Sequence, residues 1–526
     1  MKKRMMAVAM SALMAGSMLA AVPAAAEGTD VWDEKWADVD TSEHVVINYM
    51  TTGDPKDNGA TEKVLEELNK ILTEKVNAEL QIYYIGWTEY LANYNLTLAR
   101  MDGTVDLVGT ASDWLDAWPN SKNGAFLELS EEMLSTYAPK TWESVSQEHW
   151  DLCKFDGEIY MMPEDNYAQW TNHGFAYRLD WAKEAGLENG VHSWEDMTEY
   201  FRYVTANKDE LGIVTPWDSD GSQYATVAGG WIASHSNYIS IDGLSTGAFW
   251  GGTKDDPYTL YSPYVTDTDS LVEYAKLMKE WDEMGVWKTD VLNNSSSDNR
   301  EDFKIGKTAA EQHHTQTWTD LVSKTPQNIE GAEVGFFWFG EETGNLVSIN
   351  ITHGAMAVSA ASENPERALM VYDLLRNDPE CYDLINYGIK GVQWDTNEEG
   401  LRIQPASYNK DQDEFVTNYW WGRNDDLEIK DGTKDWDKID ALYEEYDKVK
   451  IEYQYGKFVA DVDDIDSYIK NIEGVNTNYM KQIAFGKYNG TAEEIVAEYQ
   501  QALKDAGIDI VTEELQRQLD EVYGEQ

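Results

Sequence analysis

Positive charge is scarce in this chain. Its 526 residues contain 41 Lys and Arg against 96 Asp and Glu, so the formal net charge is −55. A field of that sign repels phosphate backbones and anionic membrane surfaces, which argues against nucleic acid and acidic lipid as partners. An anionic ligand would need a local basic site, and the sequence indicates none. We therefore expect a neutral or cationic ligand.

Cysteine is almost absent. Cys153 and Cys381 are the only two in the chain. They can pair in an oxidising compartment or remain as buried free thiols, and their spacing leaves both options open. Neither belongs to a metal-binding motif, so we expect no metal ion and no cofactor.

Catalytic motifs are missing as well. The sequence has no Gly-x-Ser-x-Gly, no His-Glu-x-x-His, no phosphate-binding glycine loop and no eightfold strand–helix recurrence. These absences predict a protein that is not an enzyme. With 96 acidic residues a pair of carboxylates can always be nominated, so a secreted glycoside hydrolase stays open as an alternative. A binding protein for a peptide or a cationic solute is the other alternative.

A long apolar run occurs only at the start of the chain. Residues 2–4 are basic, residues 5–21 are apolar and residues 24–26 are alanines. This pattern predicts a Sec signal peptide over residues 1–26, with an extracellular mature protein. The run is too short for a spanning helix, and no second segment is able to cross a bilayer. The predicted leader contains no cysteine, so a lipid anchor is not evident.

Aromatic residues are plentiful, with 21 Trp, 31 Tyr and 12 Phe. Tryptophan is the unusual one, because a core rarely needs so many. Trp and Tyr combine apolar area with a polar tip, so an excess indicates amphipathic binding surfaces. For any single Trp the core is the commoner location, and we expect only a few to line a site.

The first part of the chain alternates between strand and helix patterns. Apolar runs typical of buried strands occupy residues 44–50, 79–85 and 105–109, and helical periodicity covers residues 61–76 and 87–100. A β-α-β-α-β order with nearly continuous apolar strands predicts a parallel sheet covered by helices.

Ligands of such sheets bind beyond the carboxyl ends of the strands. The loop after Met50 carries Asp54, and the loop after Val108 carries Asp113 and Trp114. Carboxylates accept hydroxyl hydrogen bonds and an indole covers an apolar ring face, so these three residues are candidates for a binding site. Each Asp can instead be a turn or helix-cap residue.

Further elements follow along the chain. Strand patterns at residues 158–162 and 174–178 and helix-start signals at Ser193, Asn364 and Thr491 continue the α/β organisation, and the last fifth is mostly helical. Sheet-type segments on both sides of the middle predict that the chain leaves one lobe and later returns to it.

Several phrases together resemble one known family. They are Asp156-Gly-Glu-Ile-Tyr-x-x-Pro163, Gly174-Phe-Ala-Tyr-Arg-Leu-Asp-Trp-Ala-Lys-Glu-Ala-Gly-Leu187, Ser193-Trp-Glu-Asp196, Phe303-Lys-Ile-Gly-Lys-Thr-Ala-Ala310 and Ser362-Glu-Asn-Pro-Glu-Arg-Ala368. In this order, after a signal peptide, they resemble the family 1 extracellular solute-binding proteins of ABC importers. The tail from Tyr443 to Leu519 is similar to the C-terminal helices of the gut Gram-positive branch. Most Gram-positive members carry a lipobox cysteine, and this chain departs from them there.

The resemblance implies an α/β fold of the type II periplasmic-binding-protein kind. Two lobes, each a mainly parallel sheet flanked by helices, would be joined by crossovers, with extra C-terminal helices. The N-terminal lobe would comprise residues 27–163 and about 345–395, and the C-terminal lobe residues 164–344 and about 396–526.

The resemblance also implies a function. The family typically captures an oligosaccharide between its lobes, closes on a hinge and delivers the ligand to the permease subunits of an ABC transporter. With the charge argument, we expect a neutral oligosaccharide, bound by a monomer that catalyses no reaction.

Additional site residues follow from position and from the resemblance. Beyond Asp54, Asp113 and Trp114, we expect ligand contacts from Tyr167, Trp170, Trp231, His314, Trp318 and Trp394. Packing is the alternative for each ring. His313 and His314 are neighbours in an expected strand and point to opposite faces, so a shared zinc ion is a poor interpretation.

Overall fold

The computed structural model describes residues 30–165, 172–244, 247–294 and 297–524. The expected signal peptide, Tyr167 and Trp170 lie outside the described residues. The chain up to Val39 forms one unit, whose described part holds α1 (Val31–Lys35), and the chain from Asp40 onward forms the other. All that follows concerns the second unit.

The first sheet has the strand order β2-β1-β3-β14-β6. Its strands are β1 (Val45–Thr52), β2 (Ala78–Ile85), β3 (Leu107–Thr110), β6 (Met162–Pro163) and β14 (Ala355–Val358). β1 runs parallel to both β2 and β3, as the apolar runs predicted, and β14 is antiparallel to its two neighbours. A strand from late in the sequence therefore completes the sheet of the first part of the chain.

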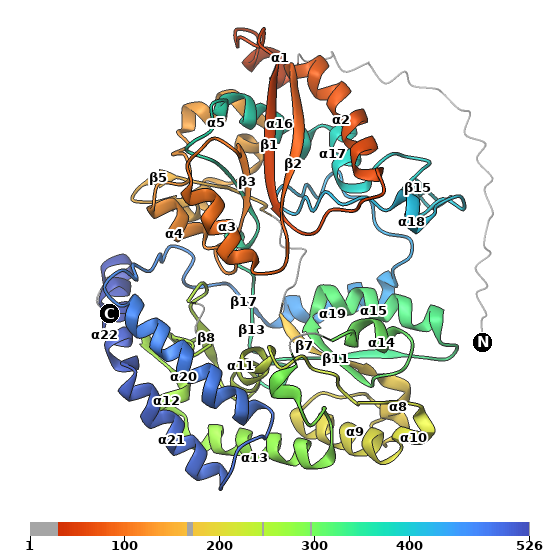
Figure 1. Cartoon of the computed structure of the whole chain (residues 1–526), viewed down its shortest axis with the longest axis vertical. Coiled ribbons are helices and arrows are strands. Elements are labelled where there is room, and N and C mark those ends of the chain that lie inside the picture. Colours follow the sequence, from red (N-terminus) through yellow and green to blue (C-terminus); the bar gives the residue numbers. More distant parts are fainter. Residues whose placement is uncertain (1–29, 166–171, 245–246, 295–296, 525–526) are drawn as a thin grey trace, which may run out of the picture. The chain divides into compact units, whose positions relative to one another are not determined.

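Helices cover this sheet (Figure 1). They include α2 (Ala60–Val76), α3 (Tyr90–Ala99), α16 (Pro365–Asn377) and α17 (Pro379–Tyr387). The apolar face of α2 buries Val64, Leu68, Leu72 and Val76. α16 lies almost wholly in the core, and its buried Arg376 donates to the backbone oxygens of Pro163 (2.7 Å) and Glu164 (3.0 Å). That pair of bonds fixes the chain where it leaves β6.

The second sheet has the order β11-β7-β12. β7 (His173–Arg178) is antiparallel to both β11 (Ala310–His314) and β12 (Val334–Trp338). This differs from the mainly parallel sheet expected for each lobe. β11 and β12 both end beside the start of β7, where His314 pairs with His173 and Trp338 with Gly174.

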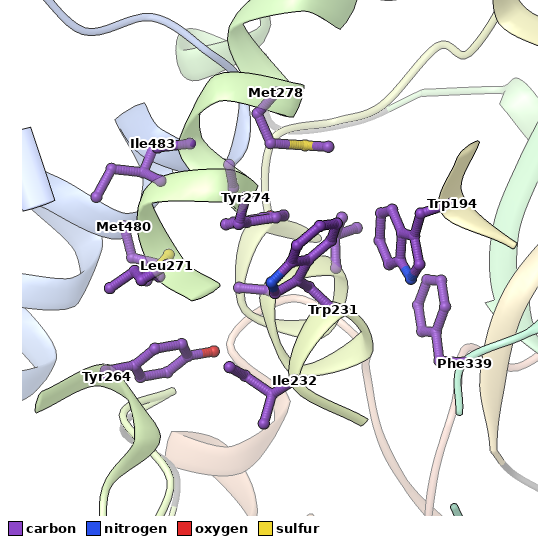
Figure 2. Packing of buried hydrophobic residues seen from close by; sticks show 14 of the residues in the cluster. Trp194, Trp231, Ile232, Tyr264, Leu271, Tyr274, Met278, Phe339, Met480 and Ile483 are labelled. Atoms are coloured by element: carbon purple, nitrogen blue, oxygen red, sulfur yellow. The ribbon is translucent and has the colours of Figure 1, made fainter. Parts of the chain in front are cut away.

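The second sheet is embedded in a large aromatic core. α9 (Trp194–Ala206), α11 (Tyr224–His235) and α13 (Thr268–Met284) supply much of it, whereas α15 (Thr315–Asn328) packs in a separate cluster with Phe336. The C-terminal helices α20 (Asp466–Ala484), α21 (Ala492–Asp505) and α22 (Ile508–Tyr523) join the same core. Figure 2 shows Met480 and Ile483 of α20 beside Leu271 and Tyr274 of α13. The tail is helical as predicted, and α21 begins with the expected capping box.

Shorter elements connect these parts. The other helices are α4 (Ala117–Lys122), α5 (Glu131–Tyr137), α6 (Pro139–Ser144), α7 (Gln147–Leu152), α8 (Leu179–Glu184), α10 (Lys208–Leu211), α12 (Pro263–Thr266), α14 (Asn299–Lys304), α18 (Lys410–Asp413), α19 (Trp436–Val449), η1 (Val291–Asn293) and η2 (Ile351–His353). The other strands are β4 (Lys154–Phe155), β5 (Glu158–Ile159), β8 (Tyr238–Ser240), β9 (Gly251–Thr253), β10 (Asp256–Tyr261), β13 (Leu346–Val347), β15 (Asp395–Thr396), β16 (Arg402–Ile403) and β17 (Lys450–Ile451).

The described residues contain neither a membrane-spanning helix nor a disulfide bond. Within them, no helix combines the length and the apolar character that a membrane span requires. Cys153 and Cys381 are both buried and both free, which settles the disulfide question that their spacing left open.

Candidate functional site

Four indoles gather where the parallel strands of the first sheet end. Trp87 follows β2, Trp114 follows β3, and Trp420 and Trp421 arrive on a segment from late in the sequence. We call these four residues the indole platform. Trp87 stacks on Trp114 (ring centroids 6.4 Å apart, 22° between planes) and on Trp420 (6.1 Å, 24°). Trp114 in turn stacks on Trp421 (5.8 Å, 24°).

One residue of the indole platform is buried and two others are partly exposed to solvent. Trp421 is 1% exposed, whereas Trp87 and Trp420 are 45% and 40% exposed. Tyr90, at the start of α3, contacts the rings of both Trp87 and Trp114. Large exposed rings held by their neighbours form an apolar surface whose shape exists before any ligand binds.

The late segment is fixed to β1 by hydrogen bonds. The Tyr49 and Thr51 hydroxyls donate to the backbone oxygen of Asn418 (2.7 and 2.9 Å), and the Asn418 amide donates to the backbone oxygen of Thr52 (2.8 Å). Trp421 Nε1 points at Thr51 Oγ1 (3.3 Å). The segment thus lies against the first sheet beyond the lobe boundary expected near residue 395.

Asp113 stands next to the indole platform. Its Oδ2 lies 2.7 Å from Nδ1 of His353 in η2, while its Oδ1 is buried and has no hydrogen-bond partner. Burial opposes a charge on His353, but the carboxylates of Asp113, Glu164 and Asp242 together outweigh that effect and raise the pKa of His353 above its usual value. Asp113 therefore keeps one acceptor oxygen that a ligand donor can satisfy.

Asp113 also lines a cavity of about 510 Å³. The other lining residues include Asn172 and His173 at the start of β7, Gly229 and Gly230 of α11, and Asp242 after β8. A smaller cavity of about 170 Å³ again has Asp113 and Asp242 in its lining. No Lys or Arg lines either cavity among the described residues.

The loop carrying Asp242 approaches the Asp113 loop closely. A Cβ on Gly243 would lie 2.7 Å from the backbone oxygen of Ser112, so only glycine fits there. Asp242 keeps more than a third of its surface accessible, yet protein surrounds its carboxyl on the cavity side. That burial, together with the Asp113 charge, raises the pKa of Asp242 to about 7.

Asp54 lies near the indole platform. It is exposed in the loop after β1, and its carboxylate would be 3.0 Å from a Cβ on Gly86, the residue before Trp87. The structure thus brings Asp54, Asp113 and Trp114 to the ends of the same sheet, as their place after the strands predicted.

Trp231 lies in the large aromatic core. It is buried on α11, its ring stacks on His235 (3.6 Å) and its Nε1 donates to the Ser270 backbone oxygen (3.1 Å). Figure 2 shows it among Tyr274 and Trp194. A ring covered on its faces by protein cannot stack on a ligand, so we leave Trp231 out of the proposed site.

Trp318 and Trp394 are also buried. Trp318, on α15, stacks on Phe336 (ring centroids 5.8 Å apart) in the cluster between this helix and β12. Trp394 is 3% exposed, donates to the Gly388 backbone oxygen (3.0 Å) and meets Tyr387 edge to face. It borders a separate cavity of about 340 Å³. Trp394, which the sequence placed among the ligand contacts, therefore anchors the end of α17.

His314 is a helix cap. Its Nδ1 accepts the backbone N–H of Thr317 (3.2 Å), and burial lowers its pKa to about 3. His173 lines the 510 Å³ cavity and His314 does not. In the described part of the chain no three His, Cys, Asp or Glu side chains are arranged to hold a metal ion.

Sequence reasoning missed Trp87, Tyr90, Trp420, Trp421 and Asp242. Trp87 had a usable signal, because it follows a predicted strand and the rule applied after Met50 and Val108 applies after Ile85 too. Trp420 and Trp421 had none, since nothing local shows that their segment returns to β1.

A model of the family described as bacterial extracellular solute-binding protein matches residues 67–381, more than half of the chain. The chain belongs to this family. The solute-binding protein also matches, over residues 454–523, a domain of unknown function (DUF3502). The resemblance found in the sequence is thereby confirmed.

The relatives of this solute-binding protein include a carbohydrate ABC transporter substrate-binding protein of Streptococcus pneumoniae, 23% identical, with 92% of each chain covered. Among solved structures, an N-glycan transport solute binding protein of S. pneumoniae matches with a TM-score of 0.66 at 19% identity, covering 91% of this chain and 99% of the other. A solute binding protein of Bifidobacterium longum infantis, described as HMO binding, matches with 0.63 at 14%, covering 92% and 100%. These likenesses confirm the two-lobed α/β fold.

Proposed function

We propose that this solute-binding protein captures a neutral oligosaccharide between its two lobes and delivers it to the permease subunits of an ABC importer. Closure on the hinge would present a changed surface to the permease, and the protein would act as an exported monomer without a catalytic step. The S. pneumoniae relative is a carbohydrate ABC transporter substrate-binding protein, and the N-glycan transport solute binding protein, which shares the fold, has been solved in complex with Man1GlcNAc and with Man5GlcNAc.

The indole platform is the observation that carries this proposal. A pyranose has an apolar C–H face and a rim of hydroxyls, so it needs a ring to lie on and acceptors beside it. Trp87 and Trp420 offer exposed rings, and the free Oδ1 of Asp113 offers a charged acceptor next to Trp114. Stacking on two or three such rings is consistent with a Kd of about 1 μM, near −8 kcal/mol.

The proposed lobes follow the sheets. We assign the first lobe β1 to β6, β14, α16, α17 and the segment through about residue 430, because Ile429 N–H still donates to the Tyr387 hydroxyl (3.1 Å). The second lobe takes β7 to β12 and the C-terminal helices. Asp54, Asp113, Trp114 and Asn172, with the newly found rings and Asp242, form the proposed ligand contacts.

A glycan array followed by calorimetry tests the function. Purified protein should bind at least one neutral oligosaccharide with micromolar Kd, and incubation should release no new reducing ends. Turnover of the bound glycan would favour the glycoside hydrolase. Binding of peptides but of no glycan would contradict the proposal.

A further inference from the structure

The cavity between the Asp113 and Asp242 loops is lined by acidic side chains and, among the described residues, by no Lys or Arg. Its described lining supplies two carboxylates. The residues adjacent in sequence that lie outside the described part, 166–171 and 245–246, contain no Lys or Arg either. Because the pKa of Asp242 is about 7, a group that enters this space above that pH meets two carboxylates that accept hydrogen bonds, one of them paired with His353.

The two carboxylates are held in place by different contacts. Asp113 is fixed through Oδ2 by His353, and its loop is bonded to η2 because Thr352 Oγ1 donates to Ser112 Oγ (2.8 Å). The Asp242 backbone N–H donates to the Tyr453 hydroxyl (2.8 Å), and Gly243 sits against Ser112. The loops that follow β3 and β8 thus present their carboxylates to one space. Among the described residues no Lys or Arg lines that space, and His353 is the basic group beside Asp113.

We propose that Asp113 and Asp242 determine ligand specificity by rejecting an acidic group and accepting a hydroxyl or an amine on the sugar residue that enters this cavity. The inference rests on the oligosaccharide-binding function proposed above and goes beyond it by naming the residues that discriminate. A ligand carboxylate would face two aspartate side chains with no Lys or Arg of the described lining beside them, whereas a hydroxyl or ammonium donor would satisfy the buried Oδ1 of Asp113.

This local effect differs from the general repulsion by a strongly negative chain. Charges farther away than a Debye length are screened, and that length is about 3 Å at 1 M salt. Discrimination that depends on the chain's overall field should therefore fade in 1 M NaCl. Discrimination by two carboxylates in direct contact with the ligand should largely remain.

The experiment uses matched sugars that differ at one atom group. From the tightest neutral oligosaccharide of the array, derivatives are made in which one CH₂OH at a time becomes a carboxylate or an aminomethyl group. Kd is measured by calorimetry in 0.15 and 1 M NaCl at pH 8, above the Asp242 pKa of about 7. We expect at least one carboxylate derivative to bind tenfold or more weaker than the parent at both salt concentrations, and its amine counterpart to bind at least as tightly as the parent.

Variants of the full-length mature protein then locate the effect. Asp242→Asn, and separately Asp113→Asn, should reduce the tenfold discrimination to less than threefold. The matched control is Asp255→Asn, which removes the same charge from an exposed turn outside the cavity and should leave the discrimination unchanged. Wild-type measurements alone already test the inference if a variant fails to fold.

The outcomes distinguish failure of this inference from failure of the proposed oligosaccharide-binding function. If no neutral oligosaccharide binds, the proposed function itself is overturned. If neutral sugars bind but every carboxylate derivative binds within threefold of its parent, only the role of Asp113 and Asp242 is overturned. The same holds if the loss is equal in wild type and in both cavity variants.

Discussion

The indole of Trp421 occupies the space beside Gly109 where any other side chain would begin. A Cβ on Gly109 would fall well inside contact distance of Trp421 Nε1. Gly109 belongs to β3 and is an ordinary buried strand residue, so the requirement for glycine comes from this approach alone. The buried base of the indole platform is thus set directly on the sheet.

Gly109→Ala should therefore displace Trp421 and tilt the rings stacked upon it. We expect the free energy of unfolding to fall by about 1–3 kcal/mol, as in other overpacked cores, and oligosaccharide affinity to fall with it. Urea denaturation and calorimetry measure the two effects. Gly474→Ala is the control, because a Cβ there meets nothing within 4 Å in helix α20 and the change should be neutral or stabilising. Equal changes in unfolding free energy and in affinity for Gly109→Ala and Gly474→Ala would contradict this explanation of Gly109.

Removal of the exposed rings should act on affinity and spare stability. Trp87→Ala and Trp420→Ala should each weaken oligosaccharide binding about tenfold, roughly 1.4 kcal/mol, because the sugar loses a stacking surface. Their free energies of unfolding should change by less than about 1 kcal/mol, since Trp87 and Trp420 already have 45% and 40% of their surface exposed to solvent. Trp87→Phe keeps a smaller ring and should fall between wild type and Trp87→Ala. Unchanged affinity in both alanine variants would remove the indole platform from the site.

Trp394→Ala should show the reverse behaviour. The ring is buried against Tyr387 and hydrogen-bonded to Gly388, so its loss should cost about 3–5 kcal/mol of stability. Oligosaccharide affinity, measured well below the lowered melting temperature, should stay within twofold of wild type. A loss of affinity without a loss of stability would restore Trp394 to the ligand site.

Glu164 makes stability depend on pH. It is buried where the chain leaves β6, its Oε1 has no hydrogen-bond partner, and burial raises its pKa to about 7 despite the nearby Arg423 and His353 charges. The folded state thus keeps a proton that the unfolded state releases near pH 4.5, so this group's contribution falls as pH rises from about 4.5 to 7.

Glu164→Gln should remove that dependence. The variant should match wild type near pH 4.5 and become more stable than wild type by a few kcal/mol at pH 8, at about 1.4 kcal/mol per pKa unit. Urea denaturation across this range measures the difference, and the exposed Glu513→Gln serves as control. A difference that is the same at pH 4.5 and pH 8 would show that the Glu164 carboxyl titrates normally.

The parts of the fold that the sequence predicted are those with local patterns. The strands around Tyr49, Leu80 and Val108 and the helix through Leu68 follow from apolar periodicity, and Asp113 and Trp114 follow from their place after a strand. Trp394 could not be placed in the same way, because a loop ring beside glycines has one pattern whether it faces a ligand or Tyr387. The return of Asn418 to Tyr49 depends on contacts between residues far apart in sequence, which periodicity does not contain.

The closeness of the four indoles has an optical consequence. Indole rings about 6 Å apart and inclined by 22–24° couple their electronic transitions, so they should add an exciton contribution to the circular dichroism spectrum beyond the signals of the individual tryptophans. A solute laid on Trp87 and Trp420 would alter that coupling. The protein therefore carries its own spectroscopic reporter, and unlabelled compounds can be screened by following it directly.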